Sequence, residues 1–177
     1  MIESEFSRMV DTRQIGGEPM VLQASEAERA ALALRFALVS IDALVAELRL
    51  TGADGAVNAA GRLTARIVQS CAVSGEDLPV TIDEPLSLRF VPESALPAPG
   101  EDDELSAEDC DDIPFTGHSF DLGEAVAQSL ALAIDPYAEG PGADEFRRKA
   151  GLLDERASGP FAALAALASK NQGSDGG

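Results

Sequence analysis

The fold is decided by residues Gly61–Pro92, which read GRLTARIVQSCAVSGEDLPVTIDEPLSLRFVP. Apolar and polar residues alternate along both halves of this stretch, and a turn-rich segment, Ser74–Asp77, lies between them. Successive side chains of a strand point to opposite faces, so this alternation predicts two half-buried strands. One apolar and one polar face is typical of an antiparallel sheet with one side in water. The predicted inward positions are Leu63, Ala65, Ile67, Gln69, Cys71, Val80, Ile82, Leu86, Leu88 and Phe90.

The alternation also extends upstream of this stretch. Leu44–Thr51 repeats it, and the Gly- and Asp-containing segment Thr51–Gly55 predicts a turn into a strand that begins near Val57. Three consecutive strands joined in this way form an antiparallel meander. Two shorter strands are predicted at Glu5–Val10 and Pro19–Gln23.

Two helices have clear start signals. Ser25 precedes Glu28 by three residues, which is the spacing of a capping box. Asp121 and Glu124 have the same spacing, and a carboxylate at this position also complements the helix dipole. We therefore expect helices over 26–37 and from 121 to a stop at Pro136, with shorter ones over 144–153 and 160–170.

These elements predict an α+β fold. We expect an antiparallel sheet covered by two main helices and followed by short C-terminal helices. The sequence does not decide whether this sheet closes into a barrel. Residues 1–170 are expected to form a single domain that contains a mobile acidic loop at about 94–112, and residues 171–177 a disordered tail.

The charge of the chain favours basic partners. The formal net charge is −18, which opposes non-specific attraction to DNA, RNA and anionic membranes. No apolar run approaches the roughly 20 residues of a membrane helix, and the N-terminus has no signal-peptide pattern, so we expect a cytoplasmic protein without membrane or DNA partners. A candidate surface for a basic partner is the block Glu101, Asp102, Asp103, Glu104, Glu108, Asp109, Asp111 and Asp112.

Two segments resemble a known family. QSCAVSGEDLPVTIDEPLSLRF is similar to the central segment of the YceD family, the large ribosomal RNA subunit accumulation proteins. FDLGEAVAQSLALAIDPYAEGPGA also resembles that family, in its acidic-Leu-Gly helix start and its Asp-Pro-Tyr ending. Some members carry Cys-x-x-Cys in the central segment, whereas here Cys71 is followed by Ala72, Val73 and Ser74. The resemblance implies a bacterial ribosome biogenesis factor that promotes accumulation of large-subunit (23S) rRNA.

The residues do not indicate an enzyme. We find no nucleophile elbow, phosphate-binding glycine loop or metal-binding helix signature. Cys71, Cys110 and His118 are too few and too separated for a structural zinc site, so we expect no metal and no cofactor. We interpret His118 as structural or solvent-facing, and Cys71 as a small buried hydrophobe rather than a reactive thiol. Acidic neighbours should make Cys110 less reactive.

Arginines are concentrated on one predicted sheet face. Arg49, Arg62, Arg66 and Arg89 all take outward positions on three neighbouring strands. Guanidinium groups bind phosphate well, so this face is a candidate contact for RNA or another partner. The interpretation that we favour slightly is cross-strand pairing with Glu47 and Asp83. No aromatic residues alternate with these arginines, which disfavours a platform for stacking bases.

Two molecular hypotheses follow for a non-enzymatic biogenesis factor. In the first, which electrostatics slightly favours, the acidic protein binds a basic ribosomal protein and delivers or shields it. In the second, the arginines contact precursor rRNA of the large subunit directly. The salt dependence of RNA binding would separate them, because each phosphate contact contributes to its slope.

Overall fold

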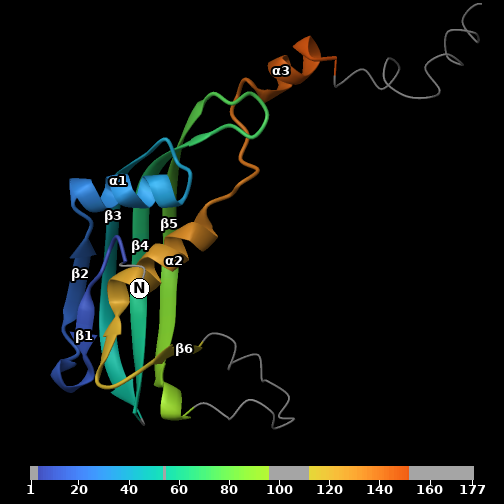
Figure 1. Ribbon diagram of the computed structural model, residues 1–177. Coiled ribbons are helices and arrows are strands. Elements are labelled where there is room, and N and C mark those ends of the chain that lie inside the picture. The colour runs from blue at the N-terminus through green and yellow to red at the C-terminus, as the bar shows by residue number, and fades with distance from the viewer. Residues whose placement is uncertain (1–3, 54, 96–111, 152–177) are drawn as a thin grey trace, which may run out of the picture. The chain divides into compact units, whose positions relative to one another are not determined.

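The computed structural model describes residues 4–53, 55–95 and 112–151 (Figure 1). Five strands form a sheet in the order β2-β3-β4-β5-β6, and β1 and β7 form a two-stranded sheet. β2 and β4 are antiparallel to β3, whereas β6 is parallel to β5. The strands are β1 (Met9–Asp11), β2 (Pro19–Gln23), β3 (Ser40–Ala53), β4 (Ala56–Ser70), β5 (Asp77–Pro92), β6 (Asp112–Phe115) and β7 (Ser119–Asp121).

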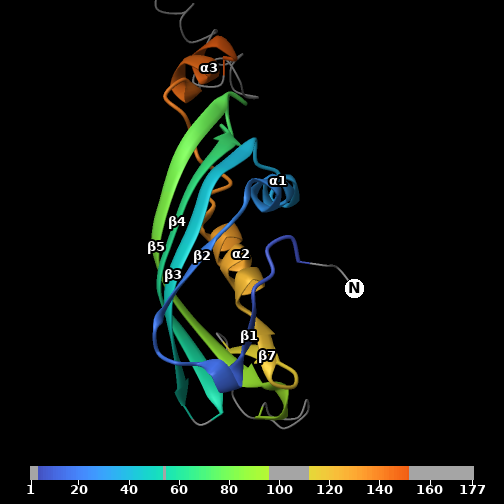
Figure 2. The same cartoon turned by 90° about the vertical axis from the view of Figure 1, so that its left-hand side faces the viewer.

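Two helices cover one face of the five-stranded sheet, α1 (Glu26–Arg35) and α2 (Leu122–Ala133) (Figure 2). A third helix, α3 (Ala143–Lys149), and the short 3-10 helices η1 (Thr12–Gln14) and η2 (Glu93–Ala95) complete the described elements. The α+β prediction with two main helices is confirmed. The described strands do not close a barrel, so the barrel-like detail is not confirmed.

The chain forms two compact units. Within the described residues, the first unit comprises 4–69 and 79–135 and contains the covered sheet, whereas the second comprises 70–78 and 136–151. The single domain over 1–170 stays a prediction. The expected helix over 160–170 and the tail 171–177 lie outside the described residues.

The period-2 pattern gives the correct faces of the long strands. Leu63, Ala65 and Ile67 of β4 are at most 2% exposed, whereas Arg62 and Arg66 are exposed. Gln69 is the buried polar residue of this inward row, and its Nε2 donates a hydrogen bond of 2.8 Å to the Asp135 carbonyl. The hairpin between β3 and β4 is longer than predicted because pairing extends to Ala53 and Ala56.

The capping box at the start of α1 is present as predicted. Glu28 N donates to Ser25 Oγ, and Ser25 N donates to Glu28 Oε2 at 2.7 Å. The helix ends where Ala37 takes a left-handed conformation with φ 54°, and Leu38 N donates to the Ala33 carbonyl at 2.9 Å. These bonds satisfy main-chain groups that the helix itself leaves without partners.

The start of α2 is joined to the N-terminal segment. Asp121 Oδ1 caps the helix by accepting from Glu124 N at 3.1 Å, and it also accepts from Arg8 N at 2.8 Å. Leu122 N donates in turn to the Arg8 carbonyl at 3.0 Å. A Cβ atom on Gly123 would lie 2.2 Å from the Phe6 carbonyl oxygen, so glycine is what allows the two segments to approach this closely.

This junction corrects the predicted strand at Glu5–Val10. Phe6 is completely buried, and the Arg8 main chain bonds to Asp121 and Leu122 instead of extending a strand. Strand pairing begins only at Met9, which lies opposite Asp121 of β7. The prediction failed because the partner of this segment lies more than a hundred residues away in the sequence.

The mobile acidic loop at about 94–112 stays a prediction, but the residues at its two ends belong to described elements. The 3-10 helix η2 extends to Ala95, and Asp112 is the first residue of β6, where it lies opposite Arg89. Its side chain is only 8% exposed, and both carboxylate oxygens accept from Arg89 Nη1, at 3.0 and 3.1 Å. Residues 96–111, which include Cys110 and the other seven acids of the block, lie outside the described residues.

We expect Gly123→Ala to lower the free energy of unfolding by about 2–3 kcal/mol, or about 5–10 °C in melting temperature. Alanine is the better helix former by roughly 1 kcal/mol, but here its methyl group would meet main-chain atoms of Phe6 and Arg8 that have little freedom to move. Gly16→Ala is the matched control, because nothing lies within 4 Å of its added Cβ. Equal melting temperatures of the two variants, measured by circular dichroism, would contradict the close crossing.

Candidate functional site

The four predicted arginines lie on one exposed sheet surface, which we call the arginine face: Arg49 of β3, Arg62 and Arg66 of β4, and Arg89 of β5. All four side chains are exposed, in agreement with the predicted outward register. In the β3–β4 ladder, Arg62 lies opposite Glu47, Arg66 opposite Ala43, and Arg49 opposite Ala60.

Two of the four arginines on the arginine face form ion pairs with acidic residues. Arg62 Nε donates to Asp83 Oδ1, and Arg89 forms an ion pair with Asp112. The hydrogen bond from Arg62 lowers the pKa of Asp83, and the same bond raises the pKa of Arg62. Arg49 and Arg66 form no ion pair with any described residue. The predicted pairing with Asp83 is therefore present, whereas Glu47 faces Arg62 only in the strand register.

The sheet surface beside Arg66 is shallow and has no ring for stacking. A hollow of about 270 Å³ is lined by Ala43, Val45, Thr64, Ala65, Arg66 and Thr81. None of these residues is aromatic, and a base-stacking platform needs aromatic faces. An RNA contact at this hollow would therefore have to depend on phosphate binding by Arg66.

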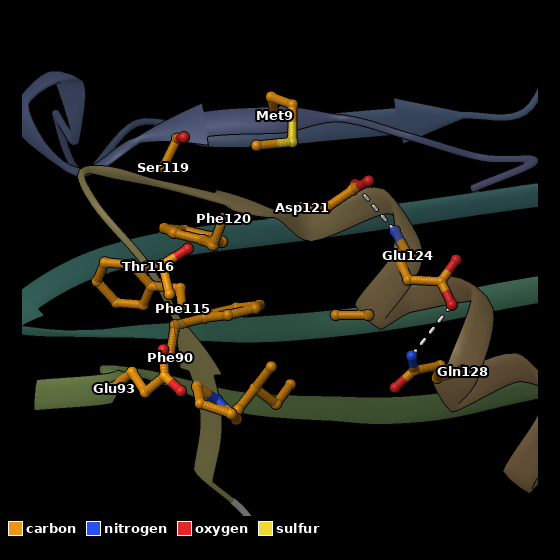
Figure 3. A pocket seen from close by; sticks show the side chains of 13 residues that line it. Met9, Phe90, Glu93, Phe115, Thr116, Ser119, Phe120, Asp121, Glu124 and Gln128 are labelled. Atoms are coloured by element: carbon orange, nitrogen blue, oxygen red, sulfur yellow. Dashed lines mark hydrogen bonds between the residues drawn. The ribbon is translucent and has the colours of Figure 1, made fainter. Parts of the chain in front are cut away.

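A second candidate site lies on the other side of the sheet, at the start of α2 (Figure 3). This aromatic pocket has a volume of about 420 Å³. Its apolar lining consists of Phe90, Phe115, Phe120, Met9, Ile113, Pro114 and Ala125. The rings of Phe90 and Phe120 stack at 4.0 Å between centroids, and Phe115 is tilted against Phe120 at 5.8 Å.

The polar lining of the aromatic pocket is acidic or neutral. It consists of Glu93, Thr116, Ser119, Asp121, Glu124 and Gln128, with no Lys, Arg or His. Glu124 is held by Arg35, whose Nη2 donates to Oε1 at 2.8 Å, and by Ser4 Oγ at 2.7 Å. The hydrogen bond from Arg35 is the main reason that the pKa of Glu124 is lowered to about 2. Glu124 is therefore ionised at any pH at which the protein would work.

Sequence reasoning missed the aromatic pocket. Phe90 was assigned to the core, and Asp121 and Glu124 only to helix capping, and both assignments are correct. The pocket arises because β1, the end of β5, β6, β7 and α2 meet, which no local pattern shows. The signal that was available is the sequence PFTGHSFD, in which a Gly-containing turn separates two phenylalanines just before a capping aspartate.

Cys71 is buried, as predicted, but its thiol has an unusual environment. Sγ accepts hydrogen bonds from Gly140 N at 3.2 Å and from Ser74 N at 3.4 Å. These donors, Gly140 first, lower the pKa of the Cys71 thiol to about 6. The interpretation of Cys71 as only a small hydrophobe is therefore incomplete, because main-chain N–H groups stabilise its thiolate.

His118 contributes no catalytic arrangement among the described residues. Its side chain is exposed, in agreement with the prediction, and its main-chain carbonyl accepts from Thr12 N at 2.9 Å. Nowhere in the described ranges do three or more His, Cys, Asp or Glu side chains form a group that could hold a metal ion. None of the described helices is long and apolar enough to cross a membrane.

We expect Cys71 to titrate near pH 6, about three units below its ordinary value of 9.0. Because the folded-state pKa is the lower one, the unfolded chain binds more protons between these values, and stability rises with pH across this window. The contribution is lost as the pH falls through about 6. Ultraviolet absorbance of the thiolate in a Cys110→Ser background measures the titration, and Cys71→Ala is the control. A midpoint near 9 would show that the N–H···S contacts do not hold in solution.

The comparisons with known proteins agree with the resemblance seen in the sequence. No curated protein and no solved structure matches the chain. A family model described as "Large ribosomal RNA subunit accumulation protein YceD" matches residues 59–168, more than half of the chain. The match includes most of β4, all of β5, every residue of the pocket lining except Met9, and Gly123, but not the N-terminal segment that Gly123 meets. The description implies a role in accumulation of the large ribosomal RNA subunit. The chain belongs to the YceD family.

Proposed function

We propose that this protein promotes accumulation of large-subunit rRNA as a non-enzymatic factor that binds a basic ribosomal protein. The observation that supports this proposal most directly is the arrangement of charge on the arginine face. Asp83 neutralises Arg62, and Asp112 neutralises Arg89. On the most basic surface predicted from the sequence, two of the four arginines are therefore already paired with the protein's own carboxylates.

The remaining charge favours a basic partner over RNA. The chain has 31 acidic and 13 basic residues, and a net charge of −18 attracts a cationic protein over the whole surface. Exposed charges more than about 8–10 Å apart are largely screened at physiological salt, so local charge decides where the partner binds. A ribosomal protein that is captured in this way would be kept soluble until it reaches the rRNA.

Direct binding of precursor rRNA is the second candidate function. Arg49 and Arg66 are exposed and pair with no described acid, so each is able to bind a phosphate. Two phosphate contacts on a single strand give a salt slope of only about −1.4, half of what four free arginines would give. This weak attraction would have to overcome the repulsion between RNA and a strongly acidic chain.

Purification of the tagged protein from cells, with and without RNase, tests the choice between the two functions. We expect a basic ribosomal protein to remain bound after RNase treatment and to remain bound to the Arg49→Gln/Arg66→Gln variant. This variant leaves both ion pairs of the arginine face intact, so its fold should not change. Neutralising Glu101, Asp102, Asp103, Glu104, Glu108, Asp109 and Asp111, while keeping Asp112, should weaken recovery of the protein partner several-fold.

The opposite pattern would contradict the proposal. RNase would then remove every partner. The Arg49→Gln/Arg66→Gln variant would lose rRNA, whereas the variant with seven neutralised acids would still bind it. This result would make the arginine face the functional site. Arg62→Gln/Asp83→Asn serves as the matched control, because it removes an ion pair from the same face without changing its net charge.

A further inference from the structure

We infer that the aromatic pocket receives a lysine or arginine side chain of the basic protein partner. This inference rests on the proposed function and adds to it the place of contact. A volume of about 420 Å³ lies within the roughly 300–1,000 Å³ that is typical of ligand sites. The pocket therefore has room for a complete side chain.

The lining chemistry selects a cation. Three carboxylates, from Glu93, Asp121 and Glu124, line the pocket, and none of its described lining residues is a lysine, arginine or histidine. A phosphate would be repelled by Glu93 and Asp121, which have no ion-pair partner among the described residues. An apolar group would remove water from these carboxylates without replacing their hydrogen bonds, which is costly. A long cationic side chain avoids both costs because its aliphatic part contacts apolar surface while its charged end stays among the acids.

Two of the three carboxylates keep unused acceptor atoms. Asp121 Oδ1 accepts hydrogen bonds from two main-chain N–H groups, whereas its Oδ2 accepts none from a described residue. Glu93 is exposed and forms no hydrogen bond or ion pair with the described part of the chain. Glu124 already binds Arg35, Ser4 and Gln128, so it offers no free acceptor, and Arg35, which also pairs with Glu5, compensates part of its charge. Glu93 and Asp121 therefore each offer a free acceptor to a guanidinium or ammonium group, one on either side of the phenylalanine rings (Figure 3).

The apolar side of the aromatic pocket suits the stem of such a side chain. Met9 is large and apolar but 62% exposed, whereas the three phenylalanines of the lining are at most 8% exposed. Figure 3 shows Met9 on the opposite side of the phenylalanine rings from Glu93. Burying the exposed surface of Met9 under methylene groups is favourable by about 25 cal/mol per Å².

The segment that follows Glu93 in the sequence and precedes Ile113 is acidic. The described chain stops at Ala95, two residues after Glu93, and resumes at Asp112, one residue before Ile113 of the lining. Residues 96–111 contain seven acids and no lysine, arginine or histidine. The seven acids are therefore close in sequence to the pocket lining on both sides, and they belong to no part of the proposed site.

Backbone-amide NMR of the full chain at low salt tests the inference with a defined probe. The probe is a pentapeptide with blocked ends, Gly-Gly-Arg-Gly-Gly, and its control contains uncharged citrulline in place of arginine. We expect the arginine peptide to shift the signals of Thr116, Ser119 and Gln128, and the citrulline peptide to leave them unchanged. Glu93→Gln should lower the affinity for the arginine peptide about five-fold. This fold-change corresponds to roughly 1 kcal/mol for one partly exposed charge pair.

Glu47→Gln is the matched control because it removes one exposed charge from the sheet surface that faces away from the aromatic pocket. This control should lower the affinity for the arginine peptide less than two-fold. Thr116→Trp fills the mouth of the pocket without changing its charge, and it should abolish the shifts. Equal weakening by Glu47→Gln and Glu93→Gln, or shifts confined to other surfaces, would overturn the pocket as the contact.

Failure of this inference can be separated from failure of the proposed function. If the wild-type protein retains a ribosomal protein after RNase treatment and Glu93→Gln and Thr116→Trp retain it equally well, the function stands and the pocket is wrong. If single-stranded RNA, rather than the arginine peptide, shifts the pocket signals, the pocket inference is overturned as well.

Discussion

The described structure depends on the junction between the N-terminal segment and the start of α2. Asp121 Oδ1 satisfies the free N–H groups of both Arg8 and Glu124, and Leu122 N returns a hydrogen bond to Arg8. This approach is possible only because residue 123 is glycine. The junction fixes the position of α2, which buries Leu122, Val126 and Leu130 completely. Without it, the inner face of the long strands would lose one of its two helical covers.

The same junction creates the difference between the two surfaces of the sheet. On the covered surface, the α2 start brings Phe120 onto Phe90 and places Asp121 and Glu124 around the resulting pocket. No described helix covers the other surface, and its arginines are compensated in part by Asp83 and Asp112. Negative charge is therefore concentrated beside an apolar pocket, whereas positive charge lies on an open surface and is partly neutralised. This distribution favours a cationic protein over an anionic polymer.

The sequence correctly predicted the features that depend on residues close to one another in the chain. The alternation in β4 and β5, the capping box at Ser25 and the cap at Asp121 are local, and the structure confirms them. The predictions for the N-terminal strand and the environment of Cys71 were wrong or incomplete because their partners are distant in sequence. Arg8 bonds to Asp121, and Cys71 Sγ bonds to Gly140 N. The aromatic pocket was missed for the same reason.

The family motif itself has a structural explanation, which changes where function should be sought. In Asp121-Leu122-Gly123, the aspartate caps the helix, the leucine is completely buried, and the glycine allows the N-terminal segment to cross. None of these tasks requires a partner molecule. The motif therefore identifies the fold, and the groups that remain free to bind are those that the junction does not use. Near α2 these are Glu93 and Asp121 Oδ2, and on the open surface they are Arg49 and Arg66. Glu93 and Asp121 line the same pocket, whereas Arg49 and Arg66 lie on a face that carries its own carboxylates, which favours contact with a basic protein over contact with RNA.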